Sequence, residues 1–186
     1  FDAYISAKDR FASNADYFRF VGSRPPVFSP GERSQYCNGC YIVLGEVIAR
    51  VSGMPYETYV RQELFTPAEM RGAAFVATDA IVPDVAIGYT RRAPGANGEL
   101  RANLFTRGAA GSAAGGVFAT ALDLLAWTHA SAAVNPGRRG LGMAIAGGSP
   151  GSATTVEMRG EWTVIALSNL DPPAADVAAA IMRRLR

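Results

Sequence analysis

The chain has 186 residues, of which 49% are hydrophobic and 18% are charged, and its formal net charge is +2. This composition is too apolar for a disordered chain, and the length suits one ordinary domain or a large part of one. No uninterrupted apolar run of about 18 residues occurs, which excludes a membrane-spanning helix. The basic residues are scattered along the chain, so we predict no nucleic-acid partner.

The residues that most often act as bases are rare in this chain. It contains one lysine, Lys8, and one histidine, His129. His129 lies near the end of a predicted helix, where a cation is favourable beside the carbonyl groups, and we interpret it as structural. A mechanism that needs a lysine or histidine base must use one of these two residues or a group from outside the chain.

The first part of the chain has the pattern of short helices. An aromatic-rich helix is predicted before Pro25. The next helix is indicated by apolar residues at helical spacing: Ile42, Val43, Val47, Ile48 and Val51. Gly53 is a typical C-terminal stop for this helix. Pro55 opens another helix over Tyr56–Leu64, which Pro67 ends.

The middle of the chain gives fewer signals. Residues 72–118 are rich in Gly, Ala and Pro and show little periodicity, so we predict mostly loops there. Thr120 and Asp123 form a variant capping box, which predicts a helix that continues through Ala130.

An antiparallel sheet is predicted near the C-terminus. Strands over Thr154–Arg159 and Trp162–Ser168 are joined by Gly160 and Glu161. A two-residue turn with glycine first suits a type II′ hairpin. A weaker strand pattern covers Leu141–Ala146.

The order of the elements predicts an α+β fold. Helices and loops occupy residues 1–139, whereas the strands and a closing helix over Ala174–Leu185 occupy residues 140–186. This order differs from the alternation of strands and helices in a doubly wound sheet. No internal repeat or interdomain linker is evident, so we predict a single domain over residues 1–186.

Tyr36 and Asn38 form a candidate chemical pair immediately before the predicted helix at Ile42. In an extended segment, residues two positions apart point to the same side. A phenol there could exchange a proton with a serine hydroxyl or a leaving group if cations lower its pKa, and an amide beside it can orient a base. The structural alternative is an N-capping asparagine and a core tyrosine with a bonded hydroxyl.

A longer set of motifs around this pair resembles the serine β-lactamase/penicillin-binding-protein superfamily, in particular its class C β-lactamase-like branch with the related esterases. The resemblance covers roughly residues 27–170 in order. Its motifs are Pro30-Gly31, Tyr36-x-Asn38, Leu44-Gly45, Val51-x-Gly53, Gly88-Tyr89, Ala114–Asp123 and Gly147–Gly151. It implies a partial β-lactamase/transpeptidase-like fold. It also implies that Tyr36 acts as the base or proton relay and that Asn38 orients it.

The nucleophile motif of this superfamily is not found in the chain. That nucleophile is a serine three residues before a lysine on a helix, and Ile5 stands three residues before Lys8. In the family the motif lies upstream of Tyr-x-Asn, so we expect it in sequence before Phe1. On this interpretation, residues 1–186 are a single incomplete β-lactamase-like domain, the C-terminal portion of a longer hydrolase that is inactive alone.

A third family motif is altered. The family places Lys or His, then Thr or Ser, then Gly on a strand before its glycine turn, and here Ile145, Ala146 and Gly147 take these substrate-binding positions. An isoleucine cannot donate to a substrate carboxylate, which disfavours an anionic β-lactam and is nearer to the apolar motif of the related esterases. The backbone N–H of Gly148 would be an oxyanion donor, and a plain glycine turn is the alternative.

Cys37 and Cys40 suggest two other kinds of site. A Cys-x-x-Cys at a helix N-terminus is the setting of redox proteins, but a thioredoxin-like fold needs a preceding buried strand, and Ser29-Pro30-Gly31 is not one. A structural zinc site would need two more ligands, and His129 is the one remaining histidine. Whether the two cysteines form a disulfide is left open by the sequence.

The resemblance implies acyl transfer to a serine from an ester, amide or β-lactam bond, followed by hydrolysis. The implied partners are such a small-molecule substrate and the missing N-terminal segment of the same protein, with no metal or organic cofactor. A catalytically inactive binding module is the alternative, and Ile145 motivates it. The family is compatible with a bacterial periplasmic or secreted location, which the residues do not indicate. Absent N-terminal strands would leave an unpaired sheet edge, so we expect poor solubility or self-association.

Overall fold

The computed structural model describes residues 2–93, 95–134, 143–171 and 174–185. The chain divides into two compact units, which are best described separately. The first unit contains Phe1–Leu64, Ala74–Ile81 and Gly108–Phe118. The second contains Phe65–Ala73, Val82–Arg107 and Ala119–Arg186.

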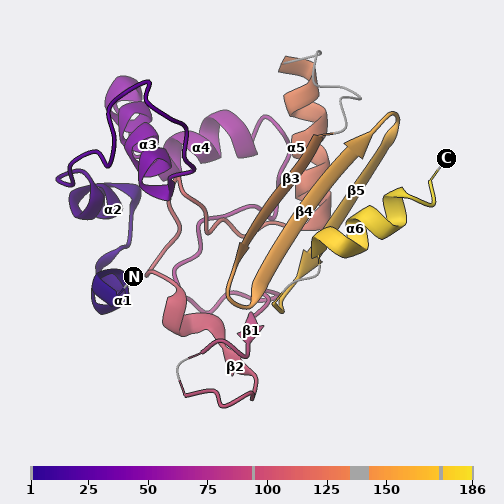
Figure 1. Ribbon diagram of the computed structural model, residues 1–186. Coiled ribbons are helices and arrows are strands. Elements are labelled where there is room, and N and C mark those ends of the chain that lie inside the picture. Colours follow the sequence, from indigo (N-terminus) through magenta and orange to yellow (C-terminus); the bar gives the residue numbers. More distant parts are fainter. Residues whose placement is uncertain (1, 94, 135–142, 172–173, 186) are drawn as a thin grey trace. The chain divides into compact units, whose positions relative to one another are not determined.

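The first unit is built from helices (Figure 1). In chain order they are α1 (Asp2–Ala7), the 3₁₀ turn η1 (Lys8–Arg10), α2 (Asn14–Val21), α3 (Asn38–Ser52) and α4 (Tyr56–Val60). The π-helical turn η2 (Arg61–Phe65) follows α4, so the helix predicted over Tyr56–Leu64 changes its hydrogen-bonding pattern after Val60. Gly53 ends α3 with a left-handed backbone (φ 73°), as predicted.

The core of the first unit joins α2 to α3. Phe11, Tyr17 and Ile42 are buried together, and the ring centroids of Phe11 and Tyr17 lie 4.7 Å apart. The Tyr17 hydroxyl donates a hydrogen bond to the carbonyl of Ala110 at 2.8 Å, which attaches the loop at residues 108–118 to this core. The aromatic residues near the N-terminus therefore provide the surface on which α3 rests.

The second unit contains an antiparallel sheet of strand order β3-β4-β5 (Figure 1). The strands are β3 (Met143–Ser149), β4 (Ser152–Arg159) and β5 (Trp162–Ser168). Arg159 pairs with Trp162 across the predicted two-residue turn. Within that turn Gly160 alone has a positive φ (58°), as a type II′ hairpin requires. The strand predicted over Leu141–Ala146 extends to Ser149, and its first two residues lie outside the described residues.

Helices cover both faces of this sheet. Helix α6 (Ala174–Met182) packs on β4 and β5, while α5 (Ala121–Val134) contacts β5 from the other side (Figure 1). A cluster of Val164, Ala178 and Met182 is buried between α6 and the sheet. Helix α6 ends three residues before the predicted Leu185.

The segment predicted as mostly loops also contains short elements of the second unit. Strands β1 (Tyr89–Thr90) and β2 (Arg101–Ala102) pair in antiparallel fashion, and the 3₁₀ turn η3 (Asn103–Thr106) follows β2. These elements are too short for periodicity to reveal. Within the described ranges, no helix is long and apolar enough to cross a membrane.

Candidate active site

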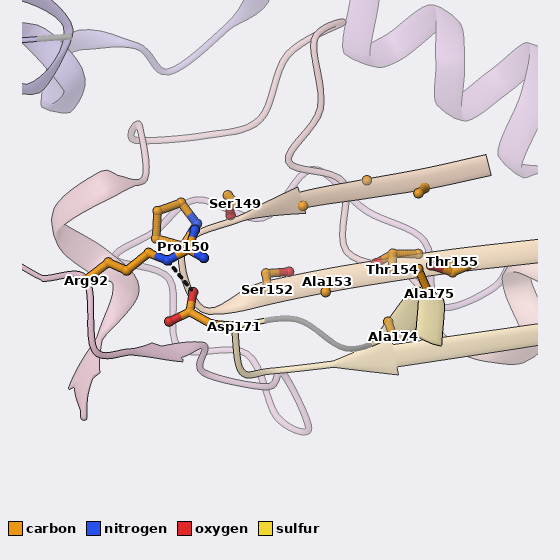
Figure 2. Close-up of a pocket in the computed structure, with 13 residues that line it drawn as sticks. Arg92, Ser149, Pro150, Ser152, Ala153, Thr154, Thr155, Asp171, Ala174 and Ala175 are labelled. Carbon is orange, nitrogen blue, oxygen red and sulfur yellow. Dashed lines mark ion pairs between the residues drawn. The ribbon is translucent and has the colours of Figure 1, made fainter. Parts of the chain in front are cut away.

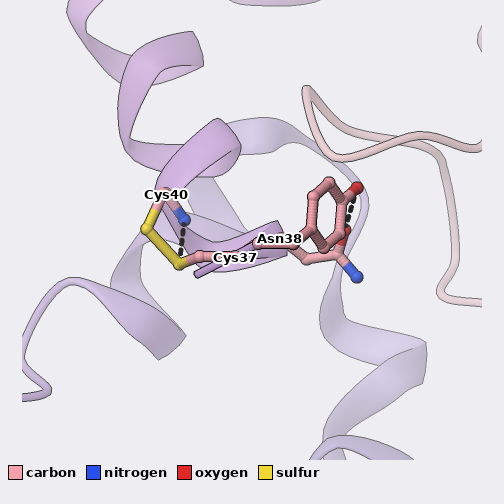
Figure 3. Close-up of a disulfide and its surroundings, with 4 residues drawn as sticks. Cys37, Asn38 and Cys40 are labelled. Carbon is pink, nitrogen blue, oxygen red and sulfur yellow. Dashed lines mark hydrogen bonds between the residues drawn. A yellow bond between two sulfur atoms is a disulfide. The ribbon is translucent and has the colours of Figure 1, made fainter. Parts of the chain in front are cut away.

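Asn38 is the first residue of α3 (Figure 3), and Tyr36 lies two residues before it. The Tyr36 hydroxyl donates a hydrogen bond to Asn38 Oδ1 at 2.9 Å. Tyr36 is 73% exposed, so it is not the core tyrosine of the structural alternative. The N-cap of α3 is Cys37, whose sulfur accepts from the Cys40 N–H, so Asn38 is not the cap.

The hydrogen bond between these two residues defines which groups remain for a ligand. Because the phenol hydrogen points to Asn38, the lone pairs of the Tyr36 oxygen can accept from a ligand hydroxyl. The amide nitrogen of Asn38 can donate. An open surface cavity of about 460 Å³ includes Tyr36 but not Asn38 in its lining, which consists of Ser34, Gln35, Tyr36, Cys37, Cys40, Tyr41 and Leu44. The arrangement can hold a polar group beside aromatic surface.

The position of α3 is fixed by Asn14, a residue that sequence reasoning missed. Asn14 is 1% exposed, and its side chain donates to the Ile42 carbonyl and accepts from the Ala113 N–H, both at 3.1 Å. Gly45 allows this approach, because a Cβ there would lie 2.5 Å from the Ala113 Cβ. The Leu-Gly motif therefore has a packing function, and its small residue was the signal for a close contact.

The altered third motif lies on β3 in the second unit. Ile145, Ala146, Gly147 and Gly148 pair with Val156, Thr155, Thr154 and Ala153 of β4. Ser149 pairs with Ser152 across a two-residue turn, and such a closing pair exchanges both backbone hydrogen bonds. Hydrogen-bonded and non-hydrogen-bonded pairs alternate, so the Gly148 pair is of the second kind.

This alternation directs the backbone groups of Gly148 away from β4. Strand β3 has a neighbour on one side only among the described residues, so the Gly148 N–H points to the open edge of the sheet. Gly148 is exposed, and a Cβ at Gly147 would meet no described atom within 4 Å. The edge therefore presents an unpaired donor next to open space, as an oxyanion-binding group requires.

The turn that follows Gly148 is held by Asp171 (Figure 2). Asp171 Oδ1 accepts from the Gly151 N–H at 3.0 Å, and Oδ2 accepts from the Thr90 hydroxyl at 2.5 Å. The Arg92 Nε lies 4.0 Å from Oδ1. Hydrogen bonds from the Thr90 hydroxyl first, and then from the Gly151 N–H, lower the pKa of Asp171.

A second contact to the same turn comes from Asn103, which is 4% exposed. Its Nδ2 donates to the Pro150 carbonyl at 3.1 Å, and its backbone N–H donates to the Gly88 carbonyl at 2.8 Å. A side chain at Gly88 would clash with the Gly151 carbonyl and with Asn103, which explains the glycine of the Gly88-Tyr89 motif. The sequence indicated that Gly88 matters, but it did not indicate that Gly88 lies against Gly151 and Asn103.

A shallow cavity of about 410 Å³ lies beside this turn (Figure 2). It is lined by residues 146–150 and 152–155 together with Arg92, Asp171, Ala174 and Ala175. Ala146, Gly147 and Gly148 thus lie at the rim of a surface hollow in the second unit. Tyr36 and Asn38 are brought together in the first unit.

Two further predictions concern lysine and metal ligands. Lys8, the single lysine, forms an ion pair with its neighbour Asp9 at 2.5 Å. Among the residues that the structure describes, no group of three or more His, Cys, Asp or Glu side chains could hold a metal ion.

Comparison with known proteins identifies the family. A family model described as Beta-lactamase matches residues 1–182. The chain belongs to the Beta-lactamase family. The predicted resemblance to the serine β-lactamase/penicillin-binding-protein superfamily is therefore confirmed, and so is the α+β fold class.

Solved structures of β-lactamase-like proteins have the same fold. A penicillin-binding protein from Bacillus halodurans is 22% identical, with a TM-score of 0.83 over 99% of this chain. An octameric penicillin-binding protein homologue from Pyrococcus abyssi is 20% identical (TM-score 0.77, 99% of this chain). A D-stereospecific amidohydrolase from Streptomyces sp. is 18% identical (TM-score 0.70, 96% of this chain). These likenesses show that the chain shares its fold with two penicillin-binding proteins and an amidohydrolase.

This β-lactamase family chain is shorter than the proteins it matches. It spans 67%, 51% and 62% of the three solved chains, respectively. A protein of Bacillus subtilis (strain 168) described as a penicillin-binding protein, PbpX, is 44% identical over 54 residues, which are 29% of this chain and 14% of that protein.

Proposed function

We propose that the chain is the C-terminal part of a serine hydrolase that acts by acyl transfer on an ester or amide bond. The observation that carries the proposal is the hydrogen bond from the exposed Tyr36 hydroxyl to Asn38 in a chain of the Beta-lactamase family. Because Tyr36 is 73% exposed and lines a cavity, its oxygen is accessible to a ligand.

In the proposed reaction Tyr36 relays one proton. A serine oxygen attacks the carbonyl carbon of the substrate, and its proton passes to the Tyr36 oxygen as the Tyr36 proton passes to the leaving group. The bond to the leaving group breaks and an acyl-serine forms. Water then attacks the acyl carbon, and its proton returns to the serine through the same phenol. Asn38 accepts the Tyr36 hydroxyl hydrogen before the reaction, which leaves lone pairs of the phenol oxygen free to accept the serine proton. The family resemblance assigns the oxyanion donor to the Gly148 N–H.

The serine is assigned to a segment outside these 186 residues. The chain contains no Ser-x-x-Lys, so the proposed partner is an N-terminal segment of the same protein that carries this motif. Among the described residues no further named strand pairs with the outer edge of β5, which supports this proposal, since an unpaired edge is a place for further strands. Without such a segment, we expect the chain to be inactive and prone to self-association.

The substrate class follows from the third motif. Ile145 stands where a lactamase places a cation, so the proposed substrate has a neutral or apolar group there rather than a carboxylate. Esters and amides fit this requirement better than anionic β-lactams. A neighbour named as an amidohydrolase is compatible with an amide.

The same isoleucine favours one second candidate, a catalytically inactive binding module with this fold. Such a module would retain the cavity beside Tyr36 and lack an activated serine. The complete reading frame distinguishes the two candidates, because the hydrolase requires a Ser-x-x-Lys motif and the module does not.

A fluorophosphonate probe tests the hydrolase directly, since it forms a covalent adduct with an activated serine. We expect one adduct, by intact mass, on the polypeptide of the complete reading frame and none on the 186-residue chain. In the longer polypeptide, Tyr36→Phe should slow ester hydrolysis by about 10²- to 10⁴-fold, the usual contribution of a positioned acid or base.

The matched control is Tyr41→Phe, which removes a hydroxyl from the same cavity and should leave the rate unchanged. Equal effects of the two substitutions would refute the relay role of Tyr36. An adduct or covalent turnover on the 186-residue chain alone would refute the assignment of the serine to another segment.

A further inference from the structure

Cys37 and Cys40 form a disulfide that encloses Asn38 (Figure 3). Only Asn38 and Gly39 lie between the two cysteines, so the residue that bonds Tyr36 is inside the ring that the disulfide closes. The covalent bond therefore restricts the backbone of the first turn of α3 where the Tyr36–Asn38 pair is formed.

The disulfide is accessible from the cavity at this end of α3. Both cysteines line that cavity together with Tyr36 and Tyr41, and Cys40 is exposed while Cys37 is half-buried. Exposed disulfides are the ones that exchange with thiols, whereas buried ones resist reduction.

The location argues against a purely stabilising cross-link. The core of the first unit, with Phe11, Tyr17 and Ile42, does not include either sulfur. A disulfide that closes so short a loop removes little chain entropy from the unfolded state, so its stabilising effect is at the low end of the range. Its clearest structural consequence is the restriction of Asn38.

We propose that Cys37 and Cys40 are a site of thiol–disulfide exchange with a dithiol reductant, and that their redox state controls the Tyr36–Asn38 pair. The exchange reaction is inferred from the disulfide and the cavity alone. The interpretation that it regulates a hydrolase rests on the proposed function.

The exchange takes place in two steps. A thiolate of the reductant attacks the sulfur of Cys40, the more exposed of the two residues. The bond between the cysteine sulfurs breaks, and Cys37 leaves as a thiolate that takes up a proton from water. The second thiol of the reductant loses its proton and attacks the mixed disulfide, which releases Cys40 and leaves the reductant as a disulfide. Two electrons pass from the reductant to the chain.

The structure favours Cys37 as the leaving sulfur. It is the N-cap of α3 and accepts from the Cys40 N–H at 2.9 Å, and α3 has no acidic residue in its first turn. Helix N-termini stabilise a thiolate, so the positive end of α3 would favour the departing charge. Once the ring is open, the backbone of Asn38 and Gly39 is free to move, and we expect the hydrogen bond to Tyr36 to be less populated.

The test uses the native 186-residue chain in buffers with graded ratios of reduced to oxidised dithiothreitol. The disulfide fraction is measured by alkylation and intact mass, and the tyrosine ring signals are followed by NMR with ¹³C-labelled tyrosine. The Tyr36→Phe variant assigns the Tyr36 signal. We expect the disulfide to open without denaturant and the Tyr36 signal to shift with the same midpoint.

The buried Tyr17 signal is the internal control. Its hydroxyl is bonded within the core, so it should stay in place if the change is local and should move if the chain unfolds. A double variant, Cys37→Ser with Cys40→Ser, retains an N-capping oxygen. In every buffer its Tyr36 ring signal should have the position seen in the wild-type chain with the disulfide reduced. Cys40→Ser alone, which leaves the Cys37 cap in place, should do the same.

Three results would overturn the proposal: a disulfide that opens only in denaturant, a Tyr36 signal that does not follow reduction, or serine variants with the oxidised-type signal. None of these measurements uses turnover. A chain that fails the fluorophosphonate test could still pass this one, so the two proposals fail separately.

Discussion

Removal of the Asp171 carboxylate should destabilise the second unit, because two buried donors depend on it. The Thr90 side chain is fully buried and the Gly151 N–H is buried, and both donate to Asp171. An unsatisfied buried donor costs about 1–3 kcal/mol, so Asp171→Ala should lower the free energy of unfolding by about 2–4 kcal/mol. Asp171→Asn keeps one acceptor oxygen but places an amide NH₂ group against one of the two donors. We therefore expect it to lower the free energy of unfolding by about 1–2 kcal/mol.

The pH dependence has a definite sign. The pKa of Asp171 is lowered in the folded chain, first by the Thr90 hydroxyl and then by the Gly151 N–H. A carboxylate of this kind stabilises the fold fully above its unfolded pKa, and the stabilisation is lost as the pH falls through the folded pKa. The difference between the wild type and Asp171→Asn should therefore be largest near neutral pH and shrink in acid.

Urea unfolding followed by circular dichroism measures both effects. Glu161→Gln is the matched control, since it makes the same chemical change on an exposed residue of the β4–β5 turn and should have little effect. If Asp171→Asn were no more harmful than Glu161→Gln, or if its effect stayed constant from neutral to acidic pH, the assigned hydrogen bonds would be wrong.

Two other predictions concern contacts within a unit, and thermal unfolding measures both. Gly45→Ala should cost about 1–3 kcal/mol, because its methyl group would overlap the neighbouring loop. Gly39→Ala in the same helix meets its nearest atom at 3.8 Å and should be neutral or stabilising by up to about 1 kcal/mol. Burial would raise the pKa of Asp123, but hydrogen bonds from Thr120 and Gly72 outweigh it and lower that pKa. Asp123→Ala should therefore cost about 1–2 kcal/mol at neutral pH and less in acid, and an effect independent of pH would contradict this.

Elements with local signals could be predicted from the sequence. The end of α3 at Gly53 and the β4–β5 turn at Gly160 each depend on a positive φ that glycine accepts easily. The start of α5 follows the capping box, in which the Thr120 N–H donates to Asp123 at 2.8 Å. In each case the decisive interaction lies within a few residues of the signal.

Interactions between distant segments could not be predicted in the same way. Thr90 and Asp171 are 81 positions apart, and Asn103 reaches the Pro150 carbonyl across 47 positions. No residue near Asp171 in the sequence indicates that Thr90 is its partner. The structural alternative of an N-capping Asn38 is not found either, since the N-cap of α3 is Cys37.

The direction of the Gly148 N–H on β3 depends on backbone geometry and on residues that are distant in the sequence. The Gly148 N–H points to the open edge because the turn between β3 and β4 has two residues, which makes the Ser149–Ser152 pair hydrogen-bonded. Asp171 and Asn103 hold this turn, so they fix the direction of a donor that neither of them contacts. The side chain at position 145 can therefore differ from the family pattern while the backbone of β3 keeps the same donor at its edge.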